Sequence, residues 1–144
     1  MKRLAIVAML MSLLCLGVNA RGKQPIALKD LPEPVKKEIL KNFTQEQIQL
    51  ITAEKEFRNY EYTFMMADGT KLEYDKRAQL RKIKKLEGVD EKFLPKVIVD
   101  YIKATLPNAI VTEYKREGMS QKVELSDKME LVFNRKGKFL RIED

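Results

Sequence analysis

Hydrophobic and polar residues alternate along two stretches of the chain that match each other without a gap. The first stretch is ADGTKLEYDKRAQLRKI at residues 67–83, and the second is SDKMELVFNRKGKFLRI at residues 126–142. Leu72 of the first corresponds to Leu131 of the second, and the other apolar positions correspond in the same way. This match predicts that the chain is built from two copies of one unit.

A helix is expected before each set of alternating residues. Pro32 and Pro95 each follow a leucine, and proline is tolerated in the first turn of a helix because its missing N–H has no acceptor there. Apolar residues then recur at helical spacing in both segments. The first helix should stop near Phe43, and Pro107 should end the second.

The residues after the first helix have the form of a capping box, with Thr44 followed three positions later by Gln47. This pattern predicts a second, short helix that carries Ile48 and Leu50. The period then changes to two, which is typical of strands with one buried face. Asp68 and the glycine after it mark a tight hairpin turn.

Together these elements predict an α+β fold. We expect a tandem repeat of a helical segment plus four-stranded antiparallel hairpins, forming one curved sheet with helices on one face. The other face should be open to solvent, because polar residues alternate with the apolar ones. The expected divisions are a signal peptide at 1–20, a flexible lead-in at 21–30, and two repeats at 31–90 and 91–144 that form one globular unit.

The first residues are typical of a secretory signal. Lys2 and Arg3 precede an apolar run at residues 4–18 that is short for a membrane span, and small residues then lead to Ala20. Cleavage is expected after Ala20, so the mature protein should be periplasmic or secreted and should have no stable membrane span.

Composition removes several classes of chemistry. Cys15 is the only cysteine and leaves with the signal peptide, and the chain has no histidine and no tryptophan. Disulfides, histidine-assisted nucleophiles and His/Cys metal sites are therefore excluded, and we expect no enzyme and no cofactor. Aspartates and glutamates mostly alternate with lysines at strand spacing, which cross-strand ion pairing would explain.

Charge does not indicate a nucleic-acid partner. The 28 basic side chains include Lys2 and Arg3, so 26 remain in the mature chain against 21 acidic ones. Both signs are mixed along the sequence, unlike the one-signed stripe of a nucleic-acid binder.

The chain resembles the PepSY-like family of exported bacterial proteins. The resemblance rests on the leucine–proline helix start, a tyrosine-led strand, the Asp-Gly hairpin, and an aromatic residue followed by Asp or Asn and a glycine turn, and it covers residues 31–142. The family is similar in fold to the β-lactamase inhibitor protein. It implies an eight-stranded curved sheet, a periplasmic binding or inhibitory role, and no catalytic residue.

Two features depart from these relatives. Ala78 stands where the second copy has Gly137 and where the family favours glycine, so the turn at Ala78 is expected to differ in conformation. The β-lactamase inhibitor protein binds its target through an aromatic-rich face and carries disulfides. The absence of tryptophan and of a mature cysteine argues against inhibition of a β-lactamase.

A basic run, KRAQLRKIKK at residues 76–85, allows two interpretations. It is either an electrostatic patch for an acidic partner or a solvated edge protected by lysines. The second copy is also basic, which favours the solvated surface. The candidate binding surface consists of Met65, Lys71, Arg81, Lys82, Lys84, Lys85, Tyr114 and Lys122.

These observations favour a non-catalytic periplasmic binding module, inhibitor-like in character, that engages a protein or peptide of the cell envelope through the open sheet face. Two alternatives remain open at this point. One is a small ligand carrier or carboxylate-based enzyme, and the other is a protein that scaffolds the envelope. The identity of the partner and the oligomeric state are not encoded in any motif.

Overall fold

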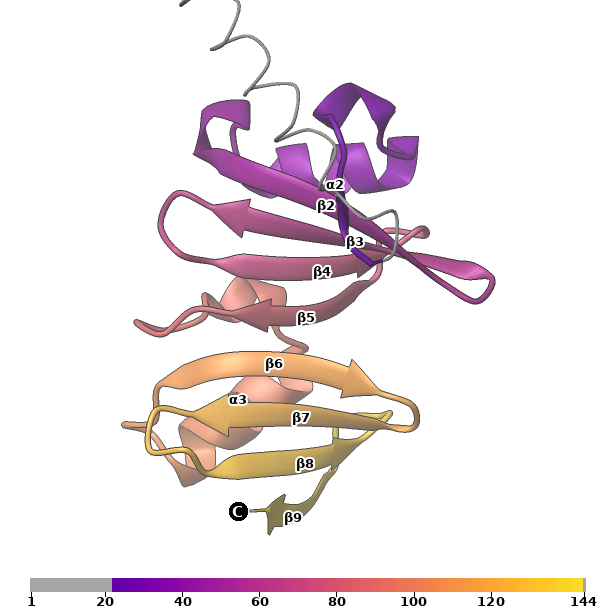
Figure 1. Ribbon diagram of the computed structural model, residues 1–144. Coiled ribbons are helices and arrows are strands. Elements are labelled where there is room, and N and C mark those ends of the chain that lie inside the picture. Colours follow the sequence, from indigo (N-terminus) through magenta and orange to yellow (C-terminus); the bar gives the residue numbers. More distant parts are fainter. Residues whose placement is uncertain (1–21, 144) are drawn as a thin grey trace, which may run out of the picture.

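The computed structural model describes residues 22–143, and the predicted signal peptide lies outside this part. These residues form one sheet of nine strands, whose order in the sheet follows their order in the chain. Every neighbouring pair is antiparallel (Figure 1). The strands are β1 (Gln24–Pro25), β2 (Ile48–Glu56), β3 (Asn59–Met66), β4 (Lys71–Asp75), β5 (Leu80–Lys84), β6 (Val111–Glu117), β7 (Ser120–Leu125), β8 (Glu130–Asn134) and β9 (Phe139–Glu143).

Two α-helices, α2 (Glu33–Asn42) and α3 (Lys96–Thr105), lie on one face of the sheet, behind it in Figure 1. Pro32 and Pro95 occupy the positions just before their first residues, which confirms the predicted helix starts. Each helix has only ten residues, so it covers only part of the sheet. The other helical segments between residues 22 and 143 are three-residue 3₁₀ turns.

The predicted α+β tandem repeat of helical segments plus four-stranded hairpins is wrong. The fold is predominantly β, with a small helical part on a single nine-stranded sheet. The expected single sheet with helices on one face is present, and β5 pairs directly with β6 across residue 90. The segment expected as a lead-in supplies β1, whose Gln24 pairs with Ala53. The physical reason is that the open edges of strands pair with one another and thereby satisfy their backbone groups.

The predicted capping box of Thr44 and Gln47 is confirmed, but the prediction that the helix it starts carries Ile48 and Leu50 is wrong. Residues Gln45–Gln47 form a single 3₁₀ turn, in which the Gln47 side chain accepts the Thr44 N–H at 2.8 Å. Ile48 already belongs to β2 and pairs with Met66 of β3. A short helix is costly to nucleate, so pairing with a long strand prevails over the local capping signal.

The core lies between the sheet and the two helices. Val35 and Ile39 of α2 and Ile98 of α3 are fully buried against the sheet. Tyr101 of α3 stacks on the Phe139 ring of β9 at a centroid distance of 4.9 Å. The other buried residues of this cluster are Leu31, Ile51, Tyr62, Phe64, Met66, Leu72, Tyr74, Ile83, Ile102, Tyr114, Val123, Leu125, Leu131 and Phe133.

Asparagine and aspartate side chains organise the turns on this sheet. The Asp75 carboxylate accepts the N–H groups of residues 77 and 79, and Asn134 accepts those of residues 136 and 138. Ala78 has a φ of 63° and Gly137 a φ of 85°. Both turns therefore use the left-handed region, and the expected difference at Ala78 is wrong. The Asx bonds hold this backbone even without a glycine.

Candidate binding surface

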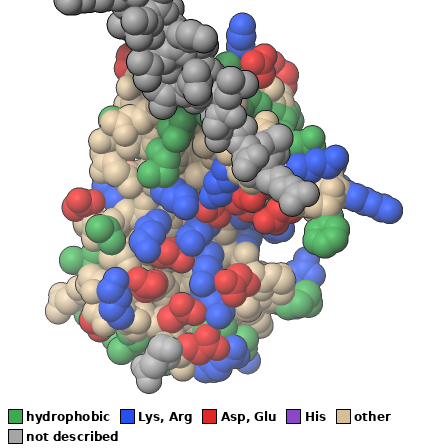
Figure 2. Space-filling view, viewed as in Figure 1, with side chains coloured by type: hydrophobic (Ala, Val, Ile, Leu, Met, Phe, Trp, Pro, Cys, Tyr) green, Lys and Arg blue, Asp and Glu red, His purple; other side chains and the backbone are tan. Residues whose placement is uncertain are grey.

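The face of the sheet opposite the helices is covered by charged side chains, and we call it the open face. It faces the viewer in Figure 2, where Lys and Arg side chains lie interleaved with Asp and Glu across the middle and lower part of the molecule. Strand alternation produces this face, because each buried residue of β3–β8 is flanked by residues that point the other way.

The charges on the open face are sorted into rows that cross the strands. In the acidic band, four glutamates on β6, β7, β8 and β9 occupy successive paired positions; they are Glu113, Glu124, Glu130 and Glu143. In the adjacent basic band, three lysines on β5, β6 and β7 do the same; they are Lys82, Lys115 and Lys122. A third row on β2, β3 and β4, the acidic corner, consists of Glu54, Glu61 and Asp75.

Most charged residues therefore face a residue of the same sign across the sheet. Eight directly opposed pairs are alike in sign; they are Glu54/Glu61, Glu61/Asp75, Lys71/Lys84, Lys82/Lys115, Lys115/Lys122, Glu113/Glu124, Glu124/Glu130 and Glu130/Glu143. Two pairs are opposite in sign; they are Glu73/Lys82 and Lys84/Glu113. Like charges directly opposite each other destabilise a sheet. The acidic residues nevertheless form ion pairs between strands, directly between Lys84 and Glu113 at 3.4 Å and otherwise with lysines one row away.

Ion pairs run between the bands instead. The Lys122 ammonium group lies 3.1 Å from Glu143, 3.2 Å from Glu130 and 3.5 Å from Glu117. Hydrogen bonds to Glu143 and Glu130 raise the pKa of Lys122 well above its ordinary value. Hydrogen bonds from Arg141 and then from Lys122 lower the pKa of Glu143. The network holds these long side chains in place.

Glu113 is the most deeply placed charge in the bands. The residue is only 6% exposed, and its two carboxylate oxygens lie 3.6 Å from the Lys82 ammonium and 3.4 Å from that of Lys84. Such partners offset the hydration that a carboxylate loses on burial. Lys82 and Lys84 are therefore largely committed to Glu113 and do not form a free basic patch.

The acidic corner borders a hollow of about 480 Å³ at the end of the sheet. Burial, followed by repulsion from Glu73 and Glu56, raises the pKa of Glu61. Arg77 and Arg81 also line the hollow, so both signs of charge surround it. Within residues 22–143 no group of three or more acidic side chains is arranged to hold a metal ion.

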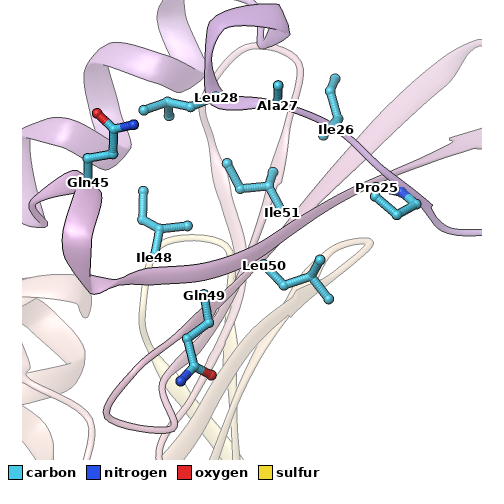
Figure 3. Close-up of a pocket in the computed structure, with 9 residues that line it drawn as sticks. All are labelled: Pro25, Ile26, Ala27, Leu28, Gln45, Ile48, Gln49, Leu50 and Ile51. Atoms are coloured by element: carbon cyan, nitrogen blue, oxygen red, sulfur yellow. The ribbon is translucent and has the colours of Figure 1, made fainter. Parts of the chain in front are cut away.

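A separate apolar groove of about 470 Å³ lies at the β1–β2 edge of the sheet (Figure 3). The segment at residues 25–28 forms one wall, and Gln45 with residues 48–51 forms the other. In Figure 3 Ile48 and Ile51 point toward the segment that carries Ile26 and Leu28. Nothing in the sequence pattern predicted this groove, because its walls come from segments that only the pairing of β1 with β2 brings together.

The predicted candidate residues do not form one patch. Four lysines and a methionine lie on the open face; they are Lys71, Lys82, Lys84, Lys122 and Met65. Arg81 is exposed beside the hollow, and Lys85 pairs with Asp68 at 3.2 Å. Tyr114 is only 1% exposed, and its hydroxyl donates to Gln121. The prediction of Tyr114 as an exposed contact is wrong, because alternation directs it toward Val123 in the core.

Sequence reasoning missed the acidic band. Alternation predicts which side of a strand each glutamate faces, but it does not predict which residues stand opposite one another. The signal that could have found the band is the register of the hairpins, which depends on irregularities in pairing between Val111 and Glu113 and between Val132 and Phe133.

With this geometry in hand, comparison with known proteins defines a class of exported bacterial protein. The chain belongs to the PepSY-like family, described as β-lactamase-inhibitor-like, whose model matches residues 18–64 and 60–141. No curated protein matches the chain. Between residues 22 and 143, no helix is long and apolar enough to cross a membrane.

Three crystal structures share the fold. A periplasmic protein from Bacteroides vulgatus, of a domain family of unknown function, is 22% identical with a TM-score of 0.77 and covers 88% of this chain and 100% of its own. A second protein from the same species, described as periplasmic and of unknown function, is 27% identical with a TM-score of 0.76, covering 85% and 100%. A third, from Bacteroides thetaiotaomicron and described as a candidate calcium-regulated periplasmic protein, is 24% identical with a TM-score of 0.76, covering 85% and 97%.

Proposed function

We propose that the protein is a non-catalytic binding module of the bacterial periplasm that engages a protein or peptide through the open face of its sheet. The expected signal peptide and the periplasmic descriptions of the structural neighbours support the location. The inhibitor-like description of the family supports a binding role.

The like-charge bands carry this proposal. A sheet that needed its surface charges only for stability would place opposite charges in register. Here Glu124 stands between Glu113 and Glu130, and Lys115 stands between Lys82 and Lys122. Such rows cost stability, so their presence is better explained by a partner with charges arranged in complementary rows. Electrostatic complementarity of this kind gives specificity and speeds association.

Organisation of the bands also supports binding. Glu113 and Lys122 are held by two and three oppositely charged groups, respectively. Side chains that are already ordered lose less entropy when a partner docks. A binding surface built in this way should therefore recognise a protein or an extended peptide that lies across the strands of β5–β9.

A small ligand carrier or carboxylate enzyme is less well supported. The hollow at the acidic corner has exposed walls, including Glu56, Lys76 and Arg77. Ligand sites of that class usually enclose most of the ligand surface. The raised pKa of Glu61 follows from partial burial and from its acidic neighbours, and it does not require a reaction.

Reversal of the acidic band tests the proposal. Mature protein carrying Glu124→Lys and Glu130→Lys would be compared with Glu46→Lys plus Glu87→Lys, which changes net charge equally at exposed positions. Wild type and the second variant should cross-link the same periplasmic partner through a photoreactive group placed at Lys115, and the band variant should lose it. Equal cross-linking by all three proteins would rule out the open face as the binding surface.

A further inference from the structure

The turns at one end of the sheet form a second surface, distinct from the open face. Because all neighbouring strands are antiparallel, the β2–β3, β4–β5, β6–β7 and β8–β9 connections lie at the same end, which we call the hairpin end. It is at the right in Figure 1, where the β2–β3 hairpin projects beyond the adjacent strands.

Nine exposed basic residues gather at the hairpin end, and none of them forms an ion pair with a carboxylate in the described part of the chain. They are Lys55, Arg58, Lys76, Arg77, Arg81, Arg116, Arg135, Lys136 and Lys138. Five acidic residues lie at the same end, Glu54, Glu56, Glu61, Asp75 and Glu117, and the last two have other partners. Asp75 accepts backbone N–H groups, and Glu117 binds Lys115 and Lys122.

Two of the most exposed apolar side chains of the described chain stand at the tips of these hairpins. Phe57 at the β2–β3 tip is 100% exposed, and Met119 at the β6–β7 tip is 70% exposed. Tyr60, 41% exposed, follows Phe57 on the same hairpin. Figure 2 shows apolar side chains among Lys and Arg along this right-hand edge. Aromatic and apolar tips flanked by cations match the boundary between water and lipid.

The backbone conformation at Phe57 is unfavourable for a phenylalanine. Its φ is 51°, in the region that favours glycine, and the equivalent turn of the β6–β7 hairpin uses Gly118 with a φ of 54°. Phe57 therefore occupies a strained turn position without any burial to compensate for it. Stability alone would select glycine or asparagine there.

We propose that the hairpin end docks on the surface of an anionic phospholipid bilayer, with Phe57 and Met119 entering the interface and the surrounding cations contacting headgroups. The tips are four strands apart, which is about 19 Å at ordinary strand spacing. A flat bilayer surface can take up two side chains that are far apart, because it needs no pocket to match each of them. A protein hot spot, by contrast, is typically a contiguous patch at the centre of an interface. Basic residues near anionic lipid add their attractions to the apolar insertion.

Within residues 22–143, the opposite end of the sheet has no comparable set of unpaired cations. Its connections mix both signs, and Asp68 pairs with Lys85, Glu91 with Lys103 and Glu124 with Lys128. The hairpin end is therefore the end that faces the bilayer. The open face stands roughly perpendicular to the membrane in this arrangement and stays accessible to a partner.

Sedimentation with vesicles tests the proposal on the mature protein. Wild type should bind vesicles that contain phosphatidylglycerol, should not bind vesicles of phosphatidylcholine alone, and should be released by salt. Phe57→Asn combined with Met119→Ser should weaken partition about tenfold or more, from the apolar area withdrawn. Asn accepts a positive φ, so this variant should unfold no more readily than wild type.

Matched control variants distinguish binding through the hairpin end from non-specific binding to vesicles. Leu86→Ser with Ile110→Ser removes exposed apolar side chains elsewhere, and it should leave binding unchanged. Arg58→Gln, Arg77→Gln and Arg135→Gln should weaken binding, whereas Lys29→Gln, Lys37→Gln and Lys41→Gln should not. No binding of wild type to anionic vesicles, or binding that the tip variant retains, would overturn the proposal. Preference for an acidic polypeptide over the vesicles would overturn it in favour of an acidic protein.

Discussion

Lys115 and Lys122 face each other directly across β6 and β7, although each could have been opposed by an acid. Their charges are balanced by carboxylates one row away, such as that of Glu117, which lies 3.1 Å from Lys115 and 3.5 Å from Lys122. This relationship repeats over the open face and turns it into rows of uniform sign. The rows have consequences for stability that can be measured apart from binding.

Glu124→Lys should make the protein more stable. The new lysine would stand opposite Glu113 on one side and Glu130 on the other, replacing two like-charge pairs by two opposite-charge pairs. Its new repulsion of Lys122 and the loss of the Glu124–Lys128 ion pair reduce the gain. We expect the free energy of unfolding to rise by about 0.5 kcal/mol, measured by urea denaturation at low salt. A loss of stability would show that the acidic band is not a strained arrangement.

Lys122→Met should have the opposite effect. Glu117, Glu130 and Glu143 would lose their shared cation on a partly buried surface, so the free energy of unfolding should fall by about 1–2 kcal/mol. Lys128→Met is the matched control, because Lys128 is 76% exposed and pairs with a single glutamate at 3.6 Å. That variant should change stability by less than about 0.5 kcal/mol.

The same substitution should alter the response to acid. The pKa of Glu117 is lowered by hydrogen bonding to Lys115 and by Lys122, and the pKa of Glu143 is lowered by Arg141 and Lys122. A lowered folded-state pKa stabilises the protein above the ordinary glutamate value of 4.5, and this contribution disappears as pH falls through the lowered pKa. As the pH is lowered from 5, the free energy of unfolding should therefore fall less for Lys122→Met than for wild type. Parallel acid profiles for the two proteins would contradict this.

Glu61→Gln should stabilise the protein at neutral pH by about 0.5 kcal/mol, since Glu61 faces Glu54 and Asp75 directly. Its pKa is raised, so the folded protein holds this proton to higher pH than the unfolded chain does. Stability is therefore lost as pH rises through the raised pKa, and the ionised form carries the full cost. The advantage of Glu61→Gln should vanish below the ordinary value of 4.5. Glu87→Gln, in an exposed loop, is the control, and both are measured by thermal unfolding across pH.

The turns at Ala78 and Gly137 should respond in opposite directions to exchange of the two residue types. Ala78→Gly relieves a residue at a φ of 63° and should stabilise the protein by about 1 kcal/mol. Gly137→Ala should destabilise it by about 1–2 kcal/mol, because the φ is 85° and a new Cβ would lie 3.2 Å from the Val97 side chain. Denaturant midpoints of the two variants check both signs. If Gly137→Ala left the free energy of unfolding unchanged, α3 would have to move at Val97 to make room for the new Cβ.

Local sequence signals determined much of this protein. Alternation identified the sheet and its polar face, Pro32 and Pro95 marked the helix starts, and Asp68 with its glycine marked a hairpin. These features depend on residues close together in the chain, where steric preferences and solvent exposure act directly. The doubled pattern, however, led to an α+β tandem-repeat prediction, whereas the fold is predominantly β, with two ten-residue helices on a nine-stranded sheet.

Only the tertiary structure decided the rest. Strand β1 and the edge groove exist because β2 is long enough to accept another strand, and Tyr114 is buried because Val123 and Ile83 stand beside it. The rows of like charge depend on register, which the pairing irregularities and turns set together across distant strands. A one-residue slip in any hairpin would disperse the rows without changing the sequence pattern. The candidate binding surface is therefore a property of strand register, which the polar residues of individual strands do not encode.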